Sequence, residues 1–158
     1  KEKTLNIQYS VAQLGELSLR NKAGEESDGC HRQFVCQLQP LPCGSRLPLS
    51  RRQNRDSANQ ENAAFPSGLC AERSAIFAAQ SNYPEQPITT LAIAARNEHG
   101  FLKSPISPCG ACRQVILEIE DRYKQPVRIL LYGEDGTYCF RSVKDLLPFS
   151  FVDANMKE

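Results

Sequence analysis

The sequence has no long apolar run and no excess of charge of either sign. None of its apolar stretches approaches the roughly 20 residues that a membrane span requires, and none resembles a signal peptide. Its 19 basic and 18 acidic residues are spread along the chain and give a formal net charge of +1. We therefore expect neither a membrane nor nucleic acid as a partner, because the composition supports no apolar anchor and no phosphate-following surface.

Cysteine is the residue type that stands out. Seven cysteines are an odd number, and without a signal peptide they favour a reducing, cytoplasmic environment in which thiols are free or bound to metal. At 158 residues the chain has the length of one domain, which buries enough surface to fold without disulfide cross-links. We expect residues 1–158 to form a single cytoplasmic domain.

The expected helices alternate with buried strands. Apolar spacing predicts helices over residues 11–26, 69–80, 109–123 and 143–147. Alternating or continuous apolar runs predict strands over residues 4–9, 88–95, 126–132 and 137–141. Ser67 is a suitable N-cap for the second helix, and Pro108 precedes the third. This alternation predicts a three-layer α/β/α domain around a mixed sheet.

Three cysteines carry the main chemical signal. Cys109 and Cys112 are three residues apart, so a helix start places both sulfurs on one face, a common arrangement for two zinc ligands. Cys70 is expected in the first turn of another helix, where the partial positive charge of the N-terminus favours a thiolate. Three thiolates can hold one tetrahedral zinc with a fourth position left for water, and Glu72 is close enough to move protons. The pattern predicts a hydrolytic zinc site.

The same residues allow other interpretations. A redox dithiol or a disulfide would also use the C-x-x-C spacing, but a redox pair leaves Cys70 and Glu72 without a role. A closed structural zinc would need Cys139 or His99 as its fourth ligand, although the first suits a small core residue and the second a solvated turn. Arg73 is either an exposed helix arginine or a hydrogen-bond donor that offsets the charge of three thiolates.

Three motifs together resemble a known enzyme family. Cys70-Ala71-Glu72-Arg73 and Pro108-Cys109-Gly110-Ala111-Cys112-Arg113-Gln114 are similar to motifs of the zinc nucleoside deaminases. Asn59-Gln60-Glu61-Asn62 narrows the resemblance to cytidine deaminase of the small, three-cysteine, homotetrameric type. The resemblance covers residues 59–151, well over half of the chain. It implies a cytidine deaminase-like α/β/α fold and hydrolytic deamination of cytidine or deoxycytidine to the uracil nucleoside, in pyrimidine salvage.

The resemblance also implies which residues carry the chemistry. Cys70, Cys109 and Cys112 would bind one zinc ion per chain. Glu72 would take a proton from the attacking water, protonate ring N3 and assist the departure of ammonia. Arg73 would hydrogen-bond a ligand sulfur. A metal centre with one proton carrier beside it is therefore expected.

Substrate binding is implied for a second group of residues. Asn59 and Glu61 would bind the ribose hydroxyls as donor and acceptor, and the backbone N–H of Ala71 would hold the base carbonyl. Phe151 would reach the site of a neighbouring subunit in the homotetramer, whereas its alternative is simple packing in the core. Phe65 stands where the family often has tyrosine, so a hydroxyl contact would be lost if that position meets the substrate.

Residues 30–58 do not fit the resemblance. The family has here a Tyr-x-x-Tyr-Ser-x-Phe-x-Val-Gly-Ala-Ala run, an Asp-Gly or Asn-Gly hairpin and a second strand. This chain instead has three prolines, a block of arginines and no helix or strand periodicity. We expect the first strand pair of the fold to be missing or disordered, because such a segment forms strands poorly. Weak or absent deaminase activity would follow even if zinc binds.

The genetic code offers an origin for this segment. In the reading frame that takes the last two bases of each codon and the first of the next, residues 38–46 can spell Phe-Ser-His-Phe-His-Val-Gly-Ala-Ala. Residues 51–52 can likewise spell Asp-Gly, and residues 53–56 can spell Arg-Thr-Val-Thr. These are the missing features in the right order. Our hypothesis is that residues 30–58 come from the same DNA read out of frame, which the codons themselves test.

Three other functions stay open at this point. The chain could be a catalytically inactive zinc-binding scaffold, in which case replacing Glu72 would change nothing. It could deaminate another aminopyrimidine, such as a blasticidin-type antibiotic, although paired Asn59 and Glu61 argue for a ribose. A nucleic-acid deaminase would need a basic groove along the strand, and the arginine block in residues 30–58 is the only such feature.

Overall fold

The computed structural model describes residues 3–12, 43–48 and 54–153. Its strands are β1 (Ser10–Ala12), β2 (Cys43–Pro48), β3 (Asn54–Ala58), β4 (Thr90–Asn97), β5 (Gly100–Phe101), β6 (Arg128–Gly133) and β7 (Gly136–Phe140). Its helices are the 3-10 turn η1 (Phe65–Ser67), α2 (Ala71–Asn82), α3 (Gly110–Tyr123) and the 3-10 turn η2 (Val143–Asp145). No helix in the described part of the chain has the length and apolar character needed to span a bilayer.

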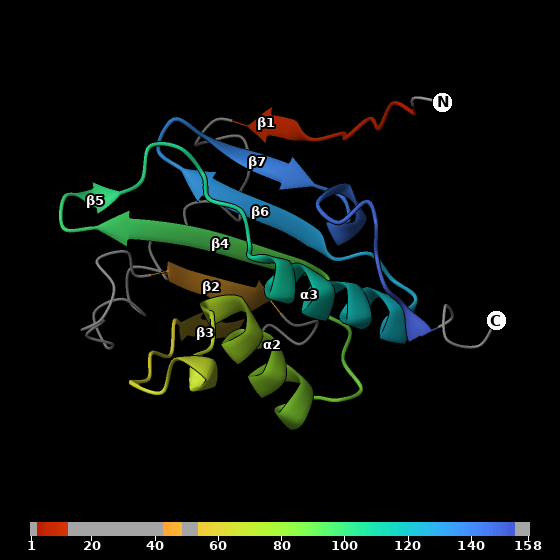
Figure 1. The fold of residues 1–158 in the computed structure, drawn as a ribbon, viewed down its shortest axis with the longest axis horizontal. Helices are drawn as coiled ribbons and strands as arrows, with labels where there is room; N and C mark the ends of the chain where they lie inside the picture. Colours follow the sequence, from red (N-terminus) through yellow and green to blue (C-terminus); the bar gives the residue numbers. More distant parts are fainter. Residues whose placement is uncertain (1–2, 13–42, 49–53, 154–158) are drawn as a thin grey trace.

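The strands form one mixed sheet in the order β1-β7-β6-β4-β2-β3, with β5 paired to β4 off this path (Figure 1). β4 and β6 are parallel, and every other pairing is antiparallel. A parallel pair needs a long crossover connection, which contains α3. The start of α3 is thereby placed above the sheet, close to the start of α2.

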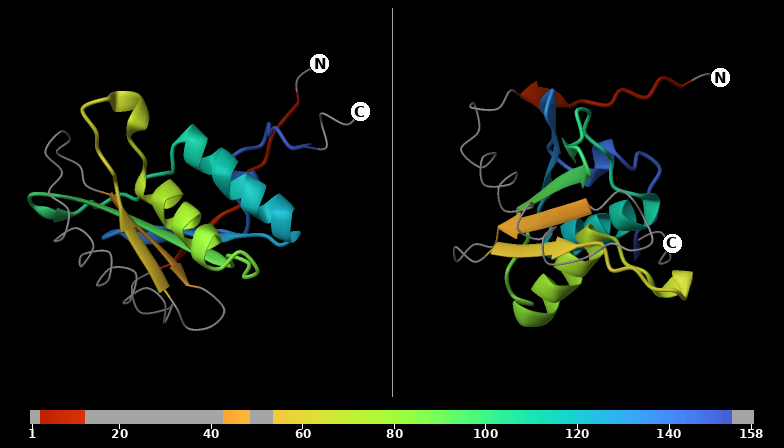
Figure 2. Two further views of the ribbon diagram at one scale, coloured as in Figure 1. Left: turned by 90° about the horizontal axis from the view of Figure 1, so that it is seen from below. Right: turned by 90° about the vertical axis from the view of Figure 1, so that its left-hand side faces the viewer.

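The core lies between the sheet and the two long helices. Both α2 and α3 cover the same face of the sheet (Figure 2), and their buried residues recur at helical spacing. Alternate residues of β4 and β6 point toward them, among them Leu91, Ile93, Ile129 and Leu131. The intervening Ala92 and Leu130 lie in a small cluster with Cys139. Both faces of these strands therefore carry buried apolar side chains.

The α/β class with a mixed sheet is confirmed. The predicted third helix matches α3, whereas α2 begins two residues later than expected because Leu69 is paired with Gln60 in a β-bridge. Cys70, not Ser67, is therefore the N-cap of α2. The third layer depends on the helix expected over residues 11–26, and residues 13–42 lie outside the described part of the chain.

The expectation of a missing strand pair is wrong. β2 and β3 pair in antiparallel register, from Gly44 with Ala58 to Pro48 with Asn54, and β2 also pairs with β4. The physical reason is that the hydrogen bonds between strands are made by backbone groups, so a segment of poor strand propensity can still pair with the edge of β4. Pro48 is the last residue of its strand, where a missing N–H disrupts the ladder least.

Candidate metal centre and active site

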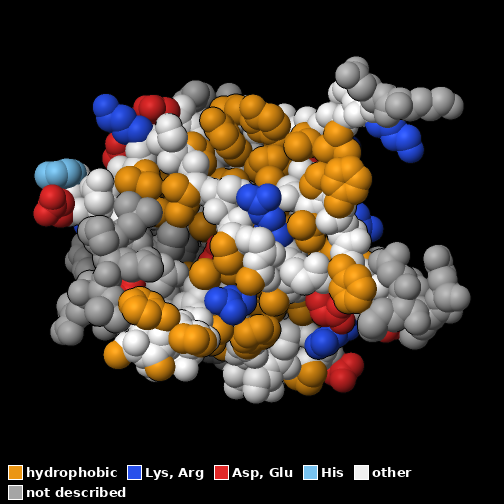
Figure 3. Space-filling view, in the orientation of Figure 1, with side chains coloured by type: hydrophobic (Ala, Val, Ile, Leu, Met, Phe, Trp, Pro, Cys, Tyr) orange, Lys and Arg blue, Asp and Glu red, His pale blue; other side chains and the backbone are white. Residues whose placement is uncertain are grey.

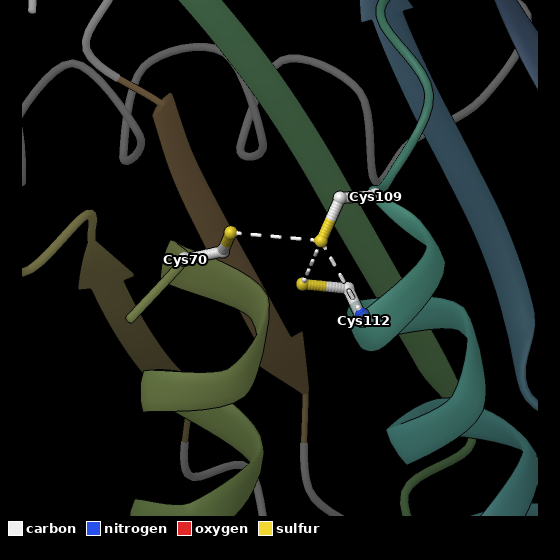
Figure 4. A group of neighbouring side chains, drawn as sticks. All are labelled: Cys70, Cys109 and Cys112. Atoms are coloured by element: carbon white, nitrogen blue, oxygen red, sulfur yellow. Dashed lines mark hydrogen bonds between the residues drawn. The ribbon is translucent and has the colours of Figure 1, made fainter. Parts of the chain in front are cut away.

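Two helix starts bring the three predicted zinc ligands together. Cys70 is the N-cap of α2, and Cys109 is the N-cap of α3. Cys112 follows in the first turn of α3. The Sγ atoms of Cys70 and Cys109 are 3.7 Å apart, those of Cys109 and Cys112 are 3.3 Å apart, and all three lie within 4.8 Å of one another (Figure 4). The predicted meeting of these thiols is confirmed.

The spacing of the sulfurs fits a tetrahedral zinc ion. Zn–S bonds of about 2.3 Å in tetrahedral geometry place ligand sulfurs about 3.8 Å apart, close to the observed separations. The three thiols are free, so the disulfide interpretation is wrong. The two candidate fourth ligands do not belong to this group. Cys139 is buried in β7, where its thiol donates to the Thr137 carbonyl, and the side chain of His99 is 82% exposed. Among the described residues the group contains three ligands, which leaves a coordination position for water or substrate.

The thiols need a cation to ionise together. Burial raises the pKa of Cys70, although its hydrogen bond with Arg73 works in the opposite direction. Burial and the charge of Glu72 raise the pKa of Cys112. Burial also opposes ionisation of Cys109, but hydrogen bonds from the backbone and side chain of Cys112 outweigh it and lower the pKa. A divalent ion reverses this balance, since coordinated thiols lose their protons.

Two side chains of the first turn of α2 complete the surroundings of the sulfurs. Glu72 is only 5% exposed, and burial raises the pKa of its carboxyl group despite hydrogen bonds from its own backbone and from Cys112. Arg73 is half-buried and donates through Nη2 to the Gly68 carbonyl at 3.4 Å and to the Cys70 sulfur at 4.0 Å. Its guanidinium group therefore faces the centre, which rules out the exposed-arginine alternative.

A pocket of about 200 Å³ opens beside Cys70. The loop that forms its wall is closed by two backbone hydrogen bonds between Gln60 and Leu69, so the ribose-binding candidates are carried back to the start of α2. The pocket is lined by Asn59, Gln60, Glu61, Asn62, Phe65, Gly68, Leu69, Cys70 and Arg73. The two residues predicted to bind the ribose and one predicted zinc ligand therefore line the same cavity.

Asn59 makes a contact that the sequence did not reveal. Its Oδ1 accepts the N–H of Ala71 at 3.0 Å, so it caps the first N–H of α2 in place of the missing side-chain cap at Cys70. An amide side chain that accepts through Oδ1 still has its Nδ2 donor for another partner. A cap twelve residues upstream leaves no local sequence signal, because capping motifs are recognised by short spacing.

Comparison with known proteins agrees with this geometry. The sequence model of the family described as "Cytidine and deoxycytidylate deaminase zinc-binding region" matches residues 49–125. The cytidine deaminase of Halalkalibacterium halodurans is 34% identical over 101 residues, which are 64% of this chain and 70% of that protein. The chain belongs to the cytidine deaminase family. Its predicted zinc cofactor is thereby supported by family and geometry together.

Other cytidine deaminases give the same result. The one from Mycoplasma genitalium is 31% identical over 104 residues, which are 65% of this chain and 73% of that protein. The crystal structure of cytidine deaminase from Burkholderia pseudomallei covers 84% of this chain and 98% of its own, with a TM-score of 0.69 and 27% identity. The cytidine deaminase-like fold is therefore confirmed.

The C-terminal segment of this cytidine deaminase lies beside the metal-binding turn. The side chains of Phe149 and Phe151 are exposed, at 88% and 58%, so the core-packing alternative is wrong. Gln114 Nε2 donates to the Phe151 carbonyl at 2.8 Å. Sequence reasoning missed this contact because it is made to a backbone atom thirty-seven residues away.

Proposed function

We propose that this chain catalyses the zinc-dependent hydrolytic deamination of cytidine and deoxycytidine, as a cytoplasmic enzyme of pyrimidine salvage. The observation that carries the proposal is the buried Glu72 in the first turn of α2, directly after Cys70, where its carboxyl group interacts with Cys112 and its charge acts on all three thiols. Family membership supports nucleoside deamination in general. The shared pocket of Asn59 and Glu61 supports a ribose-bearing substrate.

The three thiols would place a metal ion beside the attacking water. Cys70, Cys109 and Cys112 would hold one zinc ion, which supplies a Lewis acid that lowers the pKa of water. Glu72 would accept a proton from the attacking water, deliver it to N3 of the cytosine ring and then assist the departure of ammonia. Burial raises the pKa of its carboxyl group, which favours a group that both takes up and releases a proton during the reaction.

The pocket residues orient the nucleoside. Asn59 Nδ2 would donate to a ribose hydroxyl, and Glu61 would accept from one. The Ala71 N–H would hold the base carbonyl, and it is also the group that caps to Asn59 Oδ1. A bound base would therefore share this donor with Asn59, which couples base binding to the position of the ribose ligand.

We also propose that the active form is a homotetramer, in which Phe151 reaches the site of a neighbouring subunit. The surface supports this, because apolar side chains form several exposed groups on the face shown in Figure 3, and such groups mark contact surfaces. Large apolar side chains that are exposed in the single chain are Leu5, Ile7, Tyr9, Val11, Phe65, Phe77, Phe149 and Phe151.

Replacing Glu72 by glutamine tests the mechanism. The amide keeps the size of the side chain but cannot carry the proton, so kcat for cytidine should fall by about 10²–10⁴-fold while the zinc content stays near one per chain. Glu118→Gln, an exposed glutamate of α3, is the matched control and should leave kcat unchanged. Turnover is followed by the loss of cytidine absorbance.

The same experiment separates the remaining alternatives. An inactive zinc-binding scaffold would contain zinc, show no turnover and be unaffected by Glu72→Gln. The departure of residues 30–58 from the family favours reduced activity, although the strand pair that we expected to be missing is present. A panel of cytidine, deoxycytidine and a blasticidin-type aminopyrimidine decides the substrate, and preference for the last would overturn the role of Asn59 and Glu61.

A further inference from the structure

Arg113 makes three hydrogen bonds around the first turn of α3. Its Nε donates to the Pro108 carbonyl at 2.8 Å, and its Nη2 donates to Ser107 Oγ at 2.9 Å. Its Nη1 donates to the Leu146 carbonyl at 2.7 Å. The guanidinium group is planar, and its fork of donors can reach several acceptors at once in fixed directions. It is therefore bonded both to the residues just before Cys109 and to the C-terminal segment.

The three residues in the middle of the turn that these bonds enclose have little packing of their own. Cys109, Gly110 and Ala111 are exposed, and a Cβ added at Gly110 would meet nothing within 4 Å. The bonds within the turn are those from the Cys112 N–H to Cys109 Sγ at 3.4 Å and from the Arg113 N–H to the Cys109 carbonyl at 3.0 Å. Its shape therefore depends on these hydrogen bonds together with the burial of Pro108 and Cys112, which flank the exposed residues.

The next residue strengthens the link to the C-terminal segment. Gln114 donates to the Phe151 carbonyl at 2.8 Å, so two successive side chains of α3 hold residues 146–151. The Phe149 and Phe151 rings project from this segment into solvent. The turn that carries two thiols and the segment that carries two exposed aromatic rings are thus joined through Arg113 and Gln114.

We propose that Arg113 is a positioning residue for the metal centre. It holds residues 107–112 in the shape that keeps the Cys109 and Cys112 sulfurs 3.3 Å apart, and it ties residues 146–151 to that turn. The inference rests on the proposed use of these thiols as zinc ligands. Lysine could not replace Arg113 fully, because a single ammonium group lacks the planar fork that reaches three acceptors.

Cobalt(II) provides a readout that does not depend on activity. Thiolate-bound cobalt absorbs visible and near-ultraviolet light, so titration of the metal-free protein gives both a dissociation constant and a spectrum. For Arg113→Ala we expect the cobalt dissociation constant to rise about 10–100-fold, the usual effect of removing a group that orients metal ligands. Arg113→Lys should recover part of the affinity, and Ser107→Ala should cost about threefold because it removes one of three bonds.

The matched control is Arg122→Ala on the same helix. Arg122 is exposed and donates to Gln80 Oε1, away from the metal-binding turn, so cobalt affinity should stay at the wild-type value. The thermal midpoint of each metal-free variant is measured in parallel. If Arg113 positions the ligands, its loss lowers the cobalt affinity and alters the cobalt spectrum by more than the loss of stability of the metal-free protein explains. If its role is purely structural, its loss lowers the thermal midpoint of the metal-free protein and leaves the cobalt dissociation constant unchanged.

The outcomes are distinct. Wild-type cobalt affinity and spectrum in Arg113→Ala would overturn the inference and leave the proposed function intact. Absence of the thiolate–cobalt bands in the wild-type protein would overturn the proposed function itself, and this inference with it. If Arg113→Ala does not fold, Ser107→Ala decides: affinity equal to that of the wild type overturns the inference, and a reproducible loss with an unchanged metal-free midpoint supports it.

Discussion

Replacing Glu120 by alanine should destabilise this cytidine deaminase by about 4 kcal/mol. Glu120 lies in α3 and is only 5% exposed. Its Oε1 accepts the N–H groups of Val127 and Val143, each at 2.9 Å, and its Oε2 accepts the hydroxyl of Ser142 at 2.7 Å. One carboxylate therefore joins the helix that carries two zinc ligands to the start of β6 and to η2.

The magnitude follows from what the substitution leaves behind. Two buried N–H groups lose their acceptor, and each unsatisfied buried group costs about 1–3 kcal/mol. The Ser142 hydroxyl is half-buried and can turn to water, so it adds little. A loss of about 4 kcal/mol is a large part of the stability of an ordinary domain and should lower the thermal midpoint by about 8–16 °C in a chain of this length.

Two further variants test the reasoning. Glu120→Gln keeps an oxygen for the two N–H groups and should cost only about 1 kcal/mol, whereas Glu118→Ala, on the exposed side of α3, should stay within about 0.5 kcal/mol of the wild type. Urea unfolding followed by circular dichroism, with zinc and after chelation, measures all three. The argument fails if Glu120→Ala stays within about 1 kcal/mol of the wild type, or if Glu120→Gln is as damaging as the alanine variant.

Three further predictions concern the site. Asn59→Asp keeps an acceptor for the Ala71 N–H but loses the Nδ2 donor, so we expect near-wild-type stability and a KM for cytidine that is raised about tenfold or more, roughly 1.4 kcal/mol. Asn59→Ala should in addition lose about 1 kcal/mol of stability. An unchanged KM in the aspartate variant would contradict this prediction. Subunits carrying Phe151→Ala and Glu72→Gln should each be impaired alone and recover part of the activity when refolded together, and no recovery would argue against a shared site. A version with residues 30–58 recoded in the family's reading frame should be at least about tenfold more active than the present chain in the cytidine assay, and equal activity would refute the idea that this segment impairs it.

Much of the site was predictable from the sequence because its parts are local. The spacing of Cys109 and Cys112 places two sulfurs on one side of a helix start, and the helix expected over residues 109–123 is observed as Gly110–Tyr123. Glu72 follows Cys70 within one turn, so the proton carrier stays near the ligand wherever the helix lies. Side-chain periodicity and helix geometry act over a few residues, and a sequence displays them directly.

The folded chain decided what depends on distant partners. Only the sheet order places the starts of α2 and α3 together, so that Cys70 meets Cys109 across thirty-nine residues. The β2 and β3 pair forms against the edge of β4 through backbone groups that every residue except proline possesses, which is why the side chains of that segment did not predict it. The cap of Asn59 on Ala71 and the bond from Arg113 to the Leu146 carbonyl are likewise made to backbone atoms outside the local turn. Residue identity determined the chemistry of the ligands, and the tertiary structure determined which backbone groups hold them in place, because backbone donors and acceptors carry no sequence signature.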